Sequence, residues 1–149
     1  DAYSHAGARG LMQLMPYTAK RVANSLKIKY YRKALMTNPQ YNILLGTIYI
    51  KGLIKRFGGS IPLALAGYNA GPGRVKIWLK RYGDPRKNQI DYVDWIESIP
   101  ISETRNYVKK VIRNYRVYKS VFNLEEHGTD TIIAKKIKTY WHIDILSLY

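Results

Sequence analysis

The chain has no cysteine among its 149 residues, and it is poor in acidic side chains. Without cysteine it can form neither a disulfide bond nor a thiolate, although this absence does not identify the compartment. Only ten Asp and Glu stand against 25 Lys and Arg, which gives a formal net charge of +15. No apolar run approaches the ~18 residues that a membrane-spanning helix needs. The sequence therefore predicts no disulfide scaffold, no cysteine nucleophile and no membrane span.

The residues that are present indicate a folded domain. Apolar residues make up 46% of the chain and aromatic residues 13%, which argues against disorder despite the charge. A chain of this length can bury ~68–70% of its unfolded surface in one core. It opens on Asp rather than Met, and no basic-then-apolar leader is visible. We therefore expect one compact domain, processed or excised from a longer protein.

Positive charge is concentrated in two stretches that would attract polyanions. Nucleic acid, an anionic cell wall and an outer-membrane surface are all candidates, and a merely solvated basic face is the alternative. Composition does not choose among them. The basic residues are Lys20, Arg21, Lys27, Lys29, Arg32 and Lys33 in the first stretch, and Arg105, Lys109, Lys110, Arg113, Arg116 and Lys119 in the second.

Hydrophobic periodicity predicts a mainly helical chain after a Gly-rich loop over residues 1–15. Pro16 suits the first turn of a helix, whose buried face would comprise Ala19, Val22, Ala23 and Leu26. A second helix, apolar almost all round, is expected over 43–57. Ser60 would cap a third that runs to about Tyr68 and ends at the breaker residues 69–73.

Further helices are expected toward the end of the chain. A short one would bury Val75, Trp78 and Leu79, and 83–90 are a loop by composition. Ser102 resembles the cap of a long last helix, whose buried stripe would comprise Val108, Val111, Ile112, Tyr115 and Phe122. These elements predict an all-α domain over 1–122, α+β and lysozyme-like at most, with a substrate cleft. Residues 123–149 form an extension of unknown role, with a short strand possible.

Three segments combine polar side chains with glycine in a way that suits a ligand groove. They are Ser4–Pro16, which contains the run Gly10-Leu-Met-Gln-Leu-Met15, Ala66–Val75 with Tyr68-Asn69, and Ile99–Val108 with Glu103 and Tyr107. Each has a structural alternative. Met12 and Met15 would fill gaps in a core around a satisfied Gln13, Tyr68 would be a packed ring, and Glu103 would be an acid that the helix dipole favours.

Taken together and in this order, the three segments resemble the later motifs of the lytic transglycosylases, lysozyme-like enzymes that cleave peptidoglycan glycan strands. Asn38-Pro39 and residues 42–46 also match the central helix of that family, and the likeness spans roughly residues 1–122. It implies that Ser4, Gln13, Met15, Tyr68, Asn69, Glu103 and Tyr107 bind substrate or support the site. Trp95 is interpreted as structural.

The resemblance also implies a reaction. A single glutamate protonates the leaving oxygen of the MurNAc–GlcNAc β-1,4 bond and then activates the C6 hydroxyl of the same sugar, which leaves a 1,6-anhydromuramoyl end. Family members carry this glutamate in a Glu-Ser-x-Phe motif, which would fall a few residues before Asp1. We therefore predict no catalytic residue within this chain, so that the fragment is inactive and the parent, exported to the bacterial periplasm or envelope, is a lyase.

Other functions receive less support from the sequence. The three histidines are scattered and cysteine is absent, so we expect no metal, and no cofactor is implied. No Gly-x-Ser-x-Gly nucleophile elbow occurs. A non-catalytic glycan-binding module is the main alternative, and a basic helical nucleic-acid binder is the second, although no reading motif stands out. The expected partner is therefore the peptidoglycan strand, without a prediction of oligomeric state.

Overall fold

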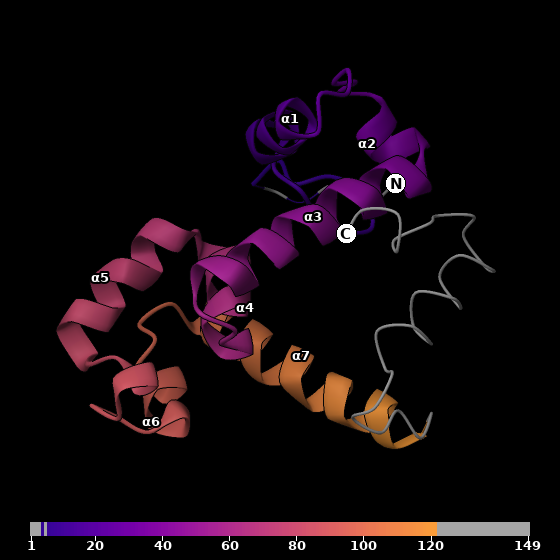
Figure 1. Ribbon diagram of the computed structural model, residues 1–149. Coiled ribbons are helices and arrows are strands. Elements are labelled where there is room, and N and C mark those ends of the chain that lie inside the picture. The colour runs from indigo at the N-terminus through magenta and orange to yellow at the C-terminus, as the bar shows by residue number, and fades with distance from the viewer. Residues whose placement is uncertain (1–3, 5, 122–149) are drawn as a thin grey trace. The chain divides into compact units, whose positions relative to one another are not determined.

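The computed structural model describes residue 4 and residues 6–121, and these form helices joined by loops (Figure 1). Within this part the only β-type pairing is an isolated antiparallel bridge between Arg9 and Leu14. The predicted all-α class is confirmed. The described residues divide into two compact units, one ending at Tyr49 and the other beginning at Ile50.

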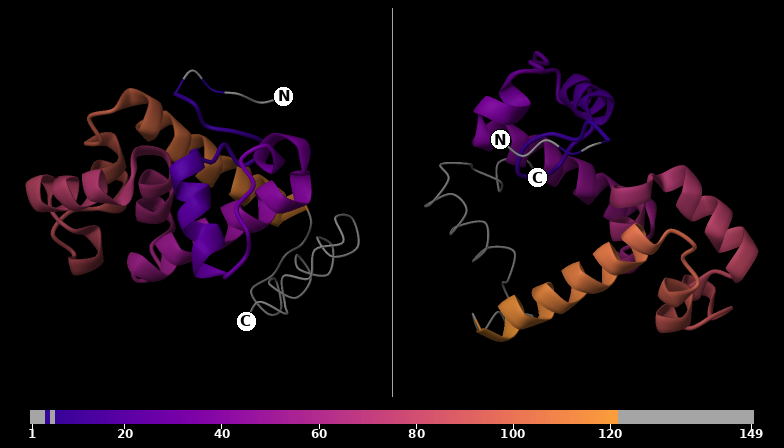
Figure 2. Two further views of the ribbon diagram at one scale, coloured as in Figure 1. Left: turned by 90° about the horizontal axis from the view of Figure 1, so that it is seen from above. Right: turned by 180° about the vertical axis from the view of Figure 1, so that it is seen from behind.

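The first unit contains the loop before Pro16 and the helices α1 (Pro16–Ser25), α2 (Ala34–Thr37) and the first part of α3 (Pro39–Arg56). Helix α1 begins at its proline, as expected, and buries the predicted face at Ala19, Val22 and Ala23. Helix α2 is a single turn that the sequence did not predict. Figure 2 shows these elements from above and from behind.

The second unit contains the rest of α3 and the helices α4 (Ile61–Ala70), α5 (Pro72–Tyr82), α6 (Tyr92–Glu97) and α7 (Ser102–Val121), with a 3₁₀ turn over Pro85–Lys87. Helix α4 packs against both α5 and α7, and α6 packs against α7 (Figure 2). None of the helices in residues 6–121 combines the length and hydropathy needed to cross a bilayer.

Three local predictions for this unit were wrong in detail. Helix α4 continues to Ala70, because Gly71 still donates its N–H to the carbonyl of Gly67. Ser60 precedes α4, but its hydroxyl caps no backbone N–H. At the start of α7 the first helical hydrogen bond runs from Arg105 N–H to Ile101 O, so Ser102 lies inside the helix.

The predicted buried stripe of α7 is correct only in its first turns. Val108 is buried and Val111 and Ile112 are half-buried, whereas Tyr115 is exposed. Helix α7 has 20 residues and its partner α4 has 10, so at about 1.5 Å per residue α7 extends well beyond α4. Phe122 and the predicted strand in 123–149 lie outside the described residues, and the 1–122 domain boundary stays a prediction.

Candidate functional site

The loop of the first motif is held by one buried amide, that of Asn42 on α3. The side chain of Asn42 is 1% exposed. Its Oδ1 accepts the N–H of Met12 at 2.7 Å, and its Nδ2 donates to the carbonyls of Arg9 and Leu35, both at 3.0 Å. A buried amide with every polar atom paired fixes what it binds. Asn42 therefore fixes the loop over residues 9–15 to helix α3 and the α2 turn.

Two glycines make this close approach possible. Gly10 has φ of 71°, and a Cβ atom there would overlap the carbonyl oxygen of Leu35 and the amide of Asn42. Gly46 lies on α3 under the loop, and a Cβ atom there would come within 2.6 Å of the Cβ of Met12. Both positions therefore require glycine for steric reasons.

The predicted site residues of the first unit lie on this loop or just before it. Gln13 is exposed, takes φ of 48° and donates through Nε2 to the carbonyl of Gly10 at 2.8 Å. Met15 directly precedes α1 and is 43% exposed, so it does not fill a core gap, whereas the half-buried Met12 contacts α3. Ser4 accepts the N–H of Ala8 at its Oγ at 2.9 Å and so stabilises the turn before the loop.

The second and third motifs meet in the second unit at the end of α4 and the start of α7. Asn69 donates through Nδ2 to Oε1 of Glu103 at 3.3 Å, and its Oδ1 accepts the hydroxyl hydrogen of Thr104 at 2.6 Å. Because an ionised carboxylate only accepts hydrogen bonds, the NH₂ group must face Glu103. This network fixes the amide orientation of Asn69 and places an exposed carboxylate beside it.

Two tyrosines flank this cluster. Tyr68 directly precedes Asn69 on α4 and is half-buried. Tyr107 lies one turn after Glu103 on α7, and burial raises the pKa of its hydroxyl above the ordinary value. Trp95 on α6 is fully buried, as a structural role requires.

Among the described residues, the carboxylates offer no evident proton donor. Asp84 is the one buried carboxylate there. Its carboxylate accepts from Arg86 Nη2 at 2.6 Å and Nε at 2.9 Å, and this pairing lowers the pKa of Asp84. A catalytic acid needs the opposite, an apolar pocket that raises its pKa. No cluster of His, Cys, Asp and Glu in residues 6–121 is arranged to hold a metal ion.

Sequence reasoning gave no role to Asn42 and Thr104. Asn42 positions the loop of the first motif, and Thr104 positions Asn69 beside Glu103. Both are polar residues with 1% exposure. The available signal for Asn42 was a short amide within an otherwise apolar helix, which must find partners when buried. Thr104 adjoins Glu103 on the side of α7 that packs against α4, and its buried hydroxyl likewise requires a hydrogen-bond partner.

The chain matches a family model described as the transglycosylase SLT domain over residues 1–90. It is 41% identical to the soluble lytic murein transglycosylase of Salmonella typhimurium over 124 residues, which is 83% of this chain and 19% of that protein. The chain thus spans about a fifth of the length of such curated relatives.

Two solved structures are similar to this chain. An inactive mutant of the lytic transglycosylase Slt from Pseudomonas aeruginosa has a TM-score of 0.71 at 40% identity, covering 83% of this chain and 19% of that one. The 70 kDa soluble lytic transglycosylase of Escherichia coli has a TM-score of 0.73 at 37% identity, covering 87% and 21%. Each likeness covers about a fifth of the solved chain.

Proposed function

Because this chain belongs to the transglycosylase SLT domain family, we propose that it is the glycan-cleaving domain of a lytic transglycosylase. Its substrate is the peptidoglycan strand, and the bond cleaved is the β-1,4 linkage between N-acetylmuramic acid and N-acetylglucosamine. The product ends in 1,6-anhydromuramic acid. A periplasmic or envelope location follows from that substrate, and the net charge of +15 suits an anionic wall.

The observation that carries this proposal is the contact between Asn69 and Glu103, which are 34 residues apart in the chain. Two motifs that resemble those of one enzyme family supply a carboxylate, an amide and a buried hydroxyl to one cluster. The carboxylate and the amide, which the hydroxyl orients through a 2.6 Å hydrogen bond, suit recognition of sugar hydroxyl and acetamido groups. Glu103 is then a substrate-orienting residue, with Tyr68 and Tyr107 beside it.

The loop fixed by Asn42, in the first unit, carries further residues that the proposal assigns to substrate binding. Gln13 and Met15 are exposed on it, so they are available to a ligand. The amide of Gln13 has both donor and acceptor atoms, which suits the mixed hydrogen bonding of a sugar. Ser4 stabilises the turn that leads into this loop.

The proton donor in the proposal is a glutamate of a Glu-Ser-x-Phe segment ahead of Ser4. Asp84 is held ionised by Arg86, and Glu103 is exposed and bonded to Asn69, so neither has the apolar surroundings of a general acid. That glutamate would protonate the leaving oxygen and then accept the proton of the C6 hydroxyl. The intramolecular attack needs no bound water as nucleophile.

Digestion of purified peptidoglycan tests the proposal. A polypeptide that includes the Glu-Ser-x-Phe segment should release muropeptides with anhydro ends, while residues 1–149 alone should release none. Glu103→Gln in the longer polypeptide should slow release about tenfold or more. Glu97→Gln, which alters an exposed acid on α6, is the matched control. Hydrolysed rather than anhydro ends, or anhydro ends from residues 1–149 alone, would overturn the assignment.

Binding by residues 1–149 alone separates an incomplete enzyme from other functions. Chitooligosaccharides should shift the NMR signals of Gln13, Asn69 and Glu103. Shifts with sugar in the absence of anhydro products from the longer polypeptide would identify a non-catalytic glycan-binding module. Salt-sensitive DNA binding without any sugar-induced shift would instead favour the nucleic-acid alternative.

A further inference from the structure

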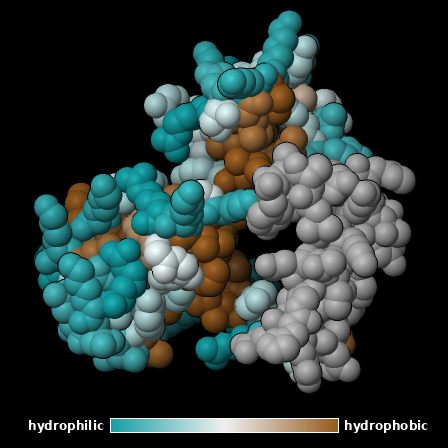
Figure 3. Space-filling view, in the orientation of Figure 1, coloured by the Kyte–Doolittle hydropathy of each residue, from teal (hydrophilic) through white to brown (hydrophobic). Residues whose placement is uncertain are grey.

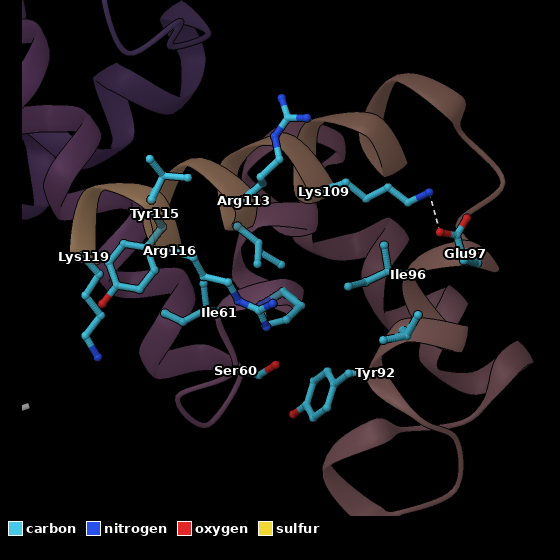
Figure 4. A pocket seen from close by; sticks show the side chains of 14 residues that line it. Ser60, Ile61, Tyr92, Ile96, Glu97, Lys109, Arg113, Tyr115, Arg116 and Lys119 are labelled. Carbon is cyan, nitrogen blue, oxygen red and sulfur yellow. Dashed lines mark ion pairs between the residues drawn. The ribbon is translucent and has the colours of Figure 1, made fainter. Parts of the chain in front are cut away.

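A second concave surface opens in the second unit between α7, α6 and the start of α4 (Figure 4). Its volume of about 920 Å³ is comparable to the roughly 300–1,000 Å³ of ligand sites. We call this surface the α7 groove. Its apolar lining consists of Ile61, Pro62, Val93, Ile96, Ile112 and Val117.

The α7 groove lies on the other side of α7 from the candidate sugar site. At about 100° per residue, Tyr107 is about 40° around the helix from Glu103, whereas the groove residues Ile112 and Arg116 are about 180° and 220° from it. Val117 is also about 40° around from Glu103, but it lies about four turns further along α7. A ligand in the α7 groove therefore contacts a different face of the helix. Nothing in the proposed reaction uses that face.

Several apolar side chains of the groove are left in contact with water. Val93 on α6 is 65% exposed and Val117 on α7 is 54% exposed. Figure 3 shows that hydrophobic surface is open to solvent between hydrophilic side chains on the molecule. A partner that covered these side chains would gain about 25 cal/mol for each Å² of apolar surface removed from water.

The charges around the groove are almost all positive. Lys109, Arg113, Arg116 and Lys119 line it, and the one acid of the lining, Glu97, forms an ion pair with Lys109 (Figure 4). Arg113 and Arg116 are exposed and project from successive turns of α7. An occupant with carboxylates beside its apolar face would complement this lining.

Ser60 lies at the edge of the groove with an unpaired hydroxyl. Its residue is only 8% exposed and it lines the groove, yet its hydroxyl has no hydrogen-bond partner among the described residues. Figure 4 shows this hydroxyl on the same side of the groove as Tyr92. A buried hydroxyl without a partner costs free energy, but protein atoms already cover this oxygen, so it does not identify what binds in the groove.

From these observations we infer that the α7 groove docks an acidic, amphipathic helix of a partner protein. A helix satisfies its own backbone polar groups, so only its side chains need partners in an apolar groove. A peptide that binds by adding a β-strand would need a free sheet edge, and the described residues form no sheet. A flat anionic membrane would meet the cationic rim but would not enter the concave apolar lining.

The test uses residues 1–149 and a fluorescein-labelled synthetic peptide of four helical turns, with Leu at i, i+3, i+4 and i+7 and Glu elsewhere. Binding is measured by fluorescence anisotropy. The wild type should bind, and Arg113→Glu/Arg116→Glu should weaken binding about tenfold or more. The matched control Lys76→Glu/Lys80→Glu makes the same charge change on exposed positions of α5 and should change Kd less than about twofold.

A second variant tests the apolar part of the groove. Val93→Ser leaves every charge in place on a side chain that is mostly exposed, so folding should be retained, and circular dichroism checks this. This substitution should weaken binding of the peptide about threefold or more. If the two charge-reversal variants lost the same affinity for the peptide, the interaction would depend only on the net charge of the protein. That result would overturn the inference.

Three further outcomes would also overturn it. One is equal affinity for a peptide with Lys in place of Glu, or for one of scrambled order. Another is binding of phosphatidylglycerol vesicles, lost in Arg113→Glu/Arg116→Glu, without peptide binding. The third is self-association by sedimentation that the same variant abolishes. None of these results depends on transglycosylase activity, so the proposed function and this inference fail separately.

Discussion

Thr104 donates its hydroxyl hydrogen to Oδ1 of Asn69 over 2.6 Å and so joins two helices through side chains 35 residues apart in the chain. The same amide donates to Glu103. The orientation of the carboxylate therefore depends on a hydroxyl that contacts no substrate in the proposed site. This arrangement leads to the first of four predictions.

Thr104→Val keeps the branched shape of the buried side chain but removes its hydroxyl. Asn69 Oδ1 then loses its donor, and we expect the free energy of unfolding to fall by about 1–2 kcal/mol. Urea denaturation measures it. Thr37→Val is the control, since Thr37 is exposed and its change should stay within about 0.5 kcal/mol. A loss no larger than that of the control would show that the bond contributes nothing.

Asn42→Ala should release the loop over residues 9–15. Three hydrogen bonds disappear at a buried position, so we expect the free energy of unfolding to fall by about 2–4 kcal/mol. Hydrogen exchange at the Met12 amide should become faster. Asn38→Ala is the control, because Asn38 accepts one N–H bond, from Tyr41, at an exposed position. An unchanged Met12 exchange rate would contradict this role for Asn42.

Gly46→Ala and Gly52→Ala make the same change on one helix, α3, and should act in opposite directions. A Cβ atom at Gly46 would lie 2.6 Å from Met12 Cβ, so overpacking should cost about 1–3 kcal/mol. A Cβ atom at Gly52 meets nothing within 4 Å, so alanine there should stabilise by about 0.5–1 kcal/mol. Thermal unfolding compares them, and equal effects would contradict the proposed contact.

Acid should weaken the second unit through Asp84. Arg86 lowers the pKa of Asp84 in the folded state, so the stabilisation is complete above the unfolded pKa of about 3.9 and is lost as pH falls through the lower folded value. Asp84→Asn should therefore destabilise the protein at pH 7 and differ less from the wild type at about pH 2–3. Urea titrations at several pH values measure this difference in stability. A difference that stays constant from pH 7 to about pH 2–3 would refute the link between the pKa of Asp84 and stability.

The helical class, the loop before Pro16 and the start of α1 could be predicted because proline, glycine and apolar periodicity act locally. The start of α5 was predicted after the breaker residues 69–73, but the helix begins at Pro72 within them. The stripe of α7 could not be predicted to its end, because Tyr115 has the right spacing but lines the open α7 groove and stays exposed. Periodicity reports which residues share a face and does not report the length of the neighbouring helix.

The candidate site was predictable in the same partial way. Motif order pointed to Asn69 and Glu103, which the structure brings together. Asn42 and Thr104 gave no comparable signal, because their importance comes from partners up to 35 residues away in the chain. Side chains that position others are recognised by burial and pairing, which only the folded chain reveals.

The attachment of the first loop has a consequence for how that loop can move. One amide on α3 holds the backbone on both sides of Gly10, so the bonds to Arg9 and Met12 cannot be broken one at a time without burying an unpaired group. We therefore expect the loop carrying Gln13 to detach cooperatively, with the two bonds lost together.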